Sequence, residues 1–257
     1  MNRIQQFASV LDSSPEELST CADVAQYSLP EEGARHWLFA PLHYERNYAY
    51  PLIVWLHGPN DDERQLKRVM PLVSMRNYVA VGPRGTVAAC EESGQGYAWS
   101  QSEDHILIAE HRVLESIESA REKFNISPSR IFLAGLACGG TMAFRIAMNH
   151  PNLVAGVLSL GGAFPTGHTP LARINEIRRL RVLLATARDS LRYPAQQVCD
   201  NLRLFYAAGM SVSLRQYPCG DELTTQMLSD MDRWIMEQLT SSTAVGRTPS
   251  EHPSRGN

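Results

Sequence analysis

The chain has 257 residues, of which 44% are hydrophobic and 20% are charged. This length and composition predict a folded α/β protein, for which about 250 residues commonly form one domain, and they argue against disorder of the chain as a whole. The formal net charge of −3 gives no electrostatic reason to expect nucleic acid or an acidic membrane surface as a partner.

The cysteines are scattered, odd in number and without CxxC spacing: they are Cys21, Cys90, Cys138, Cys199 and Cys219. This pattern favours reduced thiols over a disulfide framework or a zinc site, and we expect a cytoplasmic protein without metal or other cofactor. No apolar run approaches the ~18 residues of a membrane span. The polar first residues lack the apolar core of a signal peptide.

The two ends of the chain differ from its middle. Residues 1–30 are polar and read as an N-terminal extension with one short helix beginning near Ser14. Residues 240–257 are rich in Ser, Thr, Pro and Gly and are expected to form a disordered tail. The domain itself is therefore expected to cover residues 31–239.

Apolar runs and helical spacings alternate along this domain. In chain order they predict strands at 52–56 and 78–82, a helix at 103–123, a strand at 131–135, a helix at 141–149, strands at 154–160 and 181–187, a helix at 194–208, a strand at 212–217 and a helix at 223–239. This rhythm predicts the α/β fold class, with a mostly parallel central sheet and helices on both faces.

The third of these strands runs into a turn that carries chemical information. Its sequence, Gly135-Leu136-Ala137-Cys138-Gly139-Gly140, has a glycine on each side of a central residue and leads into a helix. This is the setting of a nucleophile elbow, Gly-x-Ser-x-Gly, in which the central residue has a strained backbone. A strand–turn–helix that needs small residues is the plain alternative, because the central residue here is Ala137.

Three further motifs, one before the elbow and two after it, stand in a fixed order along the chain. The strand at 52–56 ends in His57-Gly58, Asp189 precedes a Tyr193-Pro194 step, and Gly220-Asp221 precedes the last helix. With the elbow, these motifs make residues 35–239 resemble the small carboxylesterase, phospholipase and acyl-thioesterase branch of the α/β-hydrolases. The resemblance implies the α/β-hydrolase fold and, in intact members, a serine hydrolase that acts on carboxylic esters.

The resemblance also shows a degenerate catalytic triad. Ala137 stands where the family has its serine, and Asp221 stands where the family has its histidine. The acid position falls on Asp189, or on Ser190 when the alignment is fixed at Pro194. Two arrangements of Asp221 stay open: a like-charge pair with Asp189, or a turn outward that caps the last helix.

An oxyanion hole is what the resemblance leaves in place. Its donors would be the backbone N–H of Cys138, next to Gly139, and an N–H from the loop after His57-Gly58. His57 is expected to orient that loop rather than to act in catalysis. His168 also follows a strand end and is a second histidine that could approach the pocket.

Other polar and aromatic residues near these motifs have structural interpretations first. Residues 61–63 are expected to begin a solvated helix, with ligand contact as the lesser alternative. Arg84 is expected in a turn, or facing the pocket where it could meet an anion. Trp99 is equally expected in the core or in the pocket wall.

Three functions remain as hypotheses. The leading one is an inactive carboxylesterase-like pseudoenzyme that acts in binding or regulation, with a small-molecule ligand in the vestigial pocket. The second is an active esterase that uses Cys138 or a displaced serine as nucleophile. The third is a structural or oligomer-forming protein, although the sequence indicates no particular oligomeric state.

Overall fold

The computed structural model describes residues 35–88, 96–167 and 173–244. The expected N-terminal extension lies outside these residues, as does the part of the expected tail from residue 245 onward. His168 and the cysteines Cys21 and Cys90 also lie outside the described residues.

A seven-stranded sheet forms the centre of the molecule, in the order β1-β3-β2-β6-β7-β8-β9. Only β1 at one edge is antiparallel to its neighbour, and the other paired strands are parallel. The strands are β1 (His36–Phe39), β2 (Tyr50–Leu56), β3 (Val79–Pro83), β6 (Ile126–Leu136), β7 (Gly156–Leu160), β8 (Arg181–Ala187) and β9 (Ser211–Tyr217), with a separate ribbon of β4 (Val87–Ala88) and β5 (Tyr97–Ala98).

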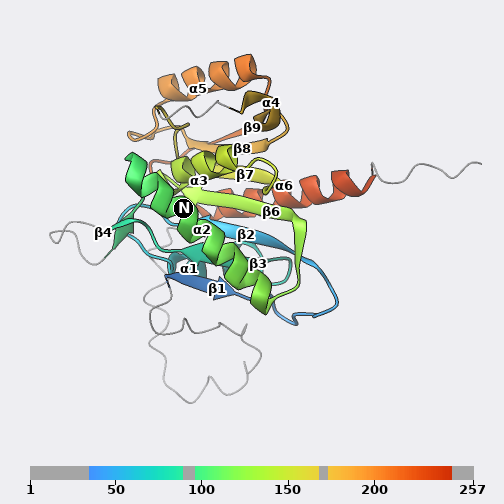
Figure 1. Ribbon diagram of the computed structural model, residues 1–257. Coiled ribbons are helices and arrows are strands. Elements are labelled where there is room, and N and C mark those ends of the chain that lie inside the picture. Colours follow the sequence, from blue (N-terminus) through green and yellow to red (C-terminus); the bar gives the residue numbers. More distant parts are fainter. Residues whose placement is uncertain (1–34, 89–95, 168–172, 245–257) are drawn as a thin grey trace, which may run out of the picture.

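Helices cover both faces of this sheet (Figure 1). One hydrophobic cluster packs α2 (Glu103–Lys123), α3 (Cys138–Asn149) and α5 (Ala195–Ala208) on one face; α1 (Gln65–Val73) and α6 (Thr225–Ala244) pack on the other. The short α4 is Ile174–Ile177. In β2, Val54 belongs to the first cluster and Trp55 to the second, as the two-residue period of a strand requires.

The predicted α/β class, with a mostly parallel sheet between helices, is confirmed. Helix α2 has the predicted bounds, and α5 ends at Gly209, whose φ of 70° closes the helix in a left-handed conformation. The edge strand β1 was not predicted, because four residues carry too little periodicity. The last helix continues to Ala244 instead of ending at Leu239, so the first residues of the expected tail are helical.

Within the described residues, no helix combines the length and the apolar character that crossing a membrane requires.

Candidate active site

The turn between β6 and α3 has the backbone geometry of a nucleophile elbow. Ala137 has φ 49° and ψ −116°, a conformation that L-residues rarely adopt and that costs about 1–3 kcal/mol. Its N–H donates to the Leu160 carbonyl oxygen at 2.9 Å, and its own carbonyl accepts from Thr141 at 3.1 Å. The strained conformation is therefore fixed by hydrogen bonds on both sides.

The glycines of the elbow are required by close packing. A methyl group on Gly139 would overlap the carbonyl oxygens of Leu56 and His57, and one on Gly135 would overlap the Gly139 backbone. The start of α3 therefore lies directly against the ends of β2 and β6. The methyl group of Ala137 lines a cavity at this end of the sheet.

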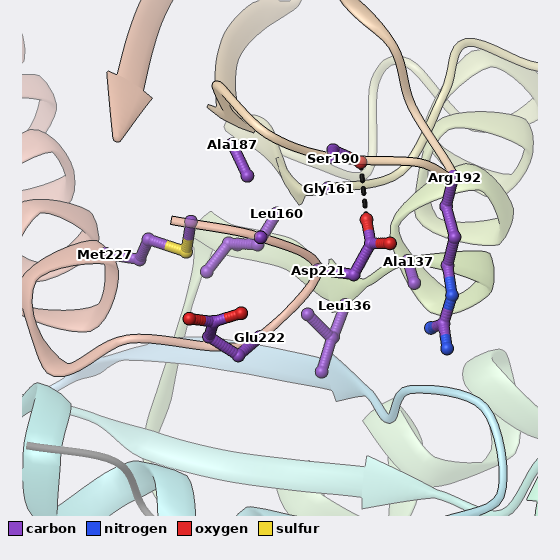
Figure 2. Close-up of a pocket in the computed structure, with 11 residues that line it drawn as sticks. Leu136, Ala137, Leu160, Gly161, Ala187, Ser190, Arg192, Asp221, Glu222 and Met227 are labelled. Atoms are coloured by element: carbon purple, nitrogen blue, oxygen red, sulfur yellow. Dashed lines mark hydrogen bonds between the residues drawn. The ribbon is translucent and has the colours of Figure 1, made fainter. Parts of the chain in front are cut away.

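The loops after β8 and β9 meet beside Ala137 through Ser190 and Asp221 (Figure 2). The Ser190 hydroxyl donates to Asp221 Oδ1, and the Leu191 N–H donates to Asp221 Oδ2 at 3.3 Å. Ser190 Oγ also accepts from the Tyr193 N–H at 2.9 Å. We call this Ser190–Asp221 arrangement the clasp, because it joins the two loops that would carry a triad acid and histidine.

Asp189 lies outside the clasp. Its carboxylate is 63% exposed and pairs with the Arg188 guanidinium at 3.3 Å. It does not line the cavity, whereas Ser190 does. The predicted pair of facing carboxylates is therefore wrong. Asp221 accepts hydrogen bonds from Ser190 and Leu191, whereas Asp189 faces solvent.

The alternative prediction, that Asp221 caps the last helix, is also wrong. Thr224 occupies that position, since its Oγ1 accepts from the Met227 N–H at 3.2 Å. Neither expected arrangement included the hydroxyl of Ser190. The sequence signal for it was the register fixed at Pro194, which put Ser190 at the acid position.

His57 is fully buried and holds the loop that follows β2. Its Nδ1–H donates to the Gly58 carbonyl at 2.7 Å, and its Nε2 accepts from the Gly85 N–H at 2.8 Å. Burial lowers the pKa of this imidazole below its ordinary value, which favours the neutral ring that both bonds require. His57 therefore orients the backbone, as expected, and does not line the cavity.

The same loop lacks the expected oxyanion donor at its first two positions. The Gly58 N–H donates to Gln65 Oε1 at 3.2 Å, and Gln65 also accepts from Trp55 Nε1 at 2.8 Å. Pro59 follows and has no N–H. The backbone N–H of Cys138, in the open first turn of α3, is the donor that remains at the elbow. Pro59 was visible in the sequence, and its consequence was missed there.

Cys138 does not line the cavity above Ala137. Its side chain packs against the core cluster that includes Trp99. Burial raises the pKa of this thiol, and hydrogen bonding to the backbone at Trp99 and Gly139 opposes that shift without overcoming it. A thiol with a raised pKa has little thiolate at neutral pH, which makes it a poor nucleophile.

The cavity above Ala137 is very small. Its water-accessible volume is about 10 Å³, which is room for one water molecule. Arg192 and Glu222 stand at its rim (Figure 2). Among the residues that the structure describes, no three His, Cys, Asp or Glu side chains are placed to hold a metal ion.

The remaining sequence candidates have structural roles. Glu63 is buried and pairs with the Arg84 guanidinium at 2.8 Å, so neither faces the cavity. Asp61 accepts from Gln65 Nε2 at 2.7 Å. Trp99 is in the core, with its Nε1–H donating to the His57 carbonyl at 3.0 Å. These contacts build the floor beneath the loop after β2.

Comparisons with known proteins agree with this architecture. The chain is 25% identical to a probable carboxylesterase of Oryza sativa subsp. japonica over 227 residues, which covers 77% of this chain and 92% of the relative. No protein-family model matches.

Two solved structures show the fold. Arabidopsis thaliana SOBER1 superposes with a TM-score of 0.63 at 18% identity, covering 74% of this chain and all (100%) of SOBER1. The Bacillus cereus carboxylesterase has the same TM-score at 15% identity, covering 79% of this chain and 93% of that one. The chain therefore has the α/β-hydrolase fold and is similar in sequence to a probable carboxylesterase.

Proposed function

We propose that this carboxylesterase-like protein no longer performs serine-hydrolase catalysis and that it acts in binding or regulation. The observation that carries the proposal is the residue at the elbow. Ala137 has the strained backbone of a nucleophile but a methyl side chain, which has no lone pair with which to attack a carbonyl carbon.

The surroundings of Ala137 support the same proposal. In a triad the imidazole removes the hydroxyl proton of the nucleophile and returns it to the leaving group. Here Asp221 takes the place of that imidazole, and its carboxylate oxygens accept hydrogen bonds from the Ser190 hydroxyl and the Leu191 N–H. One expected oxyanion position is Pro59, and the space above Ala137 holds about one water molecule. A ligand of this pocket would therefore require the clasp loops to move.

Nothing in the site favours the two nucleophiles considered as alternatives. Cys138 is partly buried against the core, and burial raises the pKa of its thiol. Ser190 lines the cavity, but its hydroxyl is held between Asp221 and Tyr193. An aspartate carboxylate is a far weaker base than a hydroxyl needs for activation near neutral pH.

An ester-hydrolysis assay tests the proposal. Purified protein is expected to hydrolyse 4-nitrophenyl acetate and butyrate no faster than two matched variants, Ser190→Ala and Cys138→Ala. Those variants remove the two candidate nucleophiles and leave Ala137 in place. An activity that either substitution abolishes overturns the proposal and identifies the nucleophile.

The free thiols support a reducing location as a further part of the proposal. Cys138, Cys199 and Cys219 are all unbridged in the structure. Thiols of this kind are typical of cytoplasmic proteins, and we propose that location here. Oxidation of the purified protein should form no intramolecular disulfide among these three, which mass spectrometry under non-reducing conditions measures.

A further inference from the structure

A larger cavity lies at the opposite end of the sheet from Ala137. Its lining includes Arg130 in β6, Tyr50 in β2, Arg76 after α1 and Met236 in α6. The water-accessible volume is about 500 Å³, against about 10 Å³ above Ala137. Strand β6 joins the two sites, since Leu136 lines the small cavity, roughly 20 Å along the strand from Arg130.

The charge in this cavity is unbalanced. Two of its lining residues are arginines, and Glu45 is the one lining residue that is acidic. Within the described residues, neither the Arg76 nor the Arg130 guanidinium forms an ion pair or a hydrogen bond, and Glu45 lies within ion-pair distance of neither. Two arginines, one exposed and one half-buried, thus line one hollow in which Glu45 is the one acidic residue.

Both arginines are attached to well-fixed backbone. Ser74 Oγ accepts from the N–H groups of Arg76 at 3.3 Å and Asn77 at 3.2 Å, which fixes the turn after α1. Arg130 directly precedes Ile131, which is fully buried and pairs with Leu52 of β2. A ligand that met both guanidinium groups would therefore not have to order the chain beneath them.

The rest of the lining is suited to an apolar body. The rings of Tyr48 and Tyr50 meet edge to face with centroids 4.7 Å apart. Tyr50 is buried and its hydroxyl accepts from the Glu45 N–H at 3.2 Å, whereas Tyr48 is 48% exposed. Met236 is 38% exposed on the other wall. Aromatic and thioether side chains that line the same hollow as two arginines can cover the apolar part of a ligand.

We propose that this cavity binds a small organic anion, a carboxylate or phosphate carried on an apolar body. The planar guanidinium groups of Arg76 and Arg130 would each donate two N–H groups to the anion, the geometry in which arginine binds oxyanions best. Tyr48, Tyr50 and Met236 would cover the apolar part. This inference is independent of the proposed function, because the two cavities share no residue.

Isothermal titration calorimetry with three probes of equal chain length tests the proposal: hexanoate, hexyl phosphate and hexanol. We expect at least one anion to bind at least ~10-fold more tightly than hexanol, and which anion binds identifies the headgroup. The double variant Arg76→Gln/Arg130→Gln should weaken that anion at least ~10-fold, the size expected for losing charged hydrogen bonds. Two controls, Arg203→Gln at an exposed position of α5 and Arg192→Gln beside Ala137, should leave the affinity for that anion within about twofold.

Several results overturn the proposal. They are an absence of binding by both anions, equal binding of hexanol, unchanged binding in the double variant, or loss of binding in Arg192→Gln. A second readout is a nuclear magnetic resonance titration of the wild type. The Nε–H signals of both Arg76 and Arg130 should shift as the anion is added, and the signal of Arg203 should stay in place. Shifts that spare both arginines contradict the assignment.

Discussion

The elbow after β6 and the paired loops after β8 and β9 resemble an intact hydrolase site to different degrees. At the elbow, backbone geometry, flanking glycines and helix start are all those of a hydrolase, and only one side chain differs. In the two loops, the side chains of Ser190 and Asp221 form a hydrogen bond with each other. The small hollow they enclose is shared by both regions.

The difference has a packing origin. The strained turn at Ala137 is required because α3 packs against the ends of β2 and β6 through Gly135 and Gly139. Removing a hydroxyl there changes no backbone contact. Loop side chains are less constrained by the sheet, so they can exchange partners while the fold persists.

Restoring the three side chains should give the largest effect. The variant Ala137→Ser/Ser190→Asp/Asp221→His is expected to hydrolyse 4-nitrophenyl acetate measurably above the wild type. Triad members act as a unit, so each single change should gain nothing detectable. The double variant without Ser190→Asp should be at least about 10-fold slower, because an acid orients the histidine.

That result would show that the elbow remains competent while the loops decide activity. If the triple variant stays inactive, adding Pro59→Gly supplies the missing backbone donor, which in other hydrolases is worth ~10²–10³ in kcat. The double variant Ala137→Ser/Asp221→His keeps Ser190 and Asp189 and is the matched control. If the triple variant is no faster than this double variant, residue 190 is not the acid position. Failure of every combination would mean that the elbow has lost its function as well.

Breaking the clasp should affect stability. Asp221→Ala removes the acceptor of two hydrogen bonds and should lower the free energy of unfolding by about 1 kcal/mol at pH 7, because Asp221 is an exposed residue. Ser190→Ala should cost at least as much, because it also leaves the buried Tyr193 N–H without its acceptor. The double variant should cost less than the sum, since the two residues share one bond. Urea denaturation of the four proteins measures this cycle. Additive effects, or stabilisation by Asp221→Ala, would contradict the clasp.

The pH dependence of stability tests the loop after β2. Burial lowers the pKa of His57 in the folded state, so the unfolded chain binds the proton more readily. Stability should therefore fall as pH decreases below the ordinary value of about 6.5, by at most ~1.4 kcal/mol per pH unit. His57→Asn should reduce this slope, because it removes the buried imidazole. An unchanged slope in His57→Asn would show that His57 is not held neutral.

The smallest predicted effect concerns backbone strain. Ala137→Gly should stabilise the fold by roughly 1 kcal/mol, because glycine adopts φ 49° without steric cost. The control Ala143→Gly, within helix α3, should destabilise by about 1 kcal/mol or more. Thermal denaturation compares them. Destabilisation by Ala137→Gly would mean that the elbow has relaxed in solution.

The sequence predicted the features that arise from repeated local pattern. Alternating apolar runs gave the parallel sheet, and Gly135 and Gly139 gave the turn that holds Ala137. Partners brought together by loops were harder to predict: Ser190 and Asp221 lie far apart in sequence, and their contact depends on how two loops fold over the sheet. The cavity at Arg76 and Arg130 carries no motif at all, because its residues come from four separate segments.

Intact-protein mass spectrometry after incubation with a fluorophosphonate probe tests the central claim most directly. The probe forms a covalent bond with an activated serine, and the account predicts an unchanged mass because Ala137 has no hydroxyl group and Ser190 is not activated. The triple variant Ala137→Ser/Ser190→Asp/Asp221→His serves as the positive comparison. A stoichiometric adduct on any serine of the wild-type protein would contradict the claim that the site has lost its nucleophile.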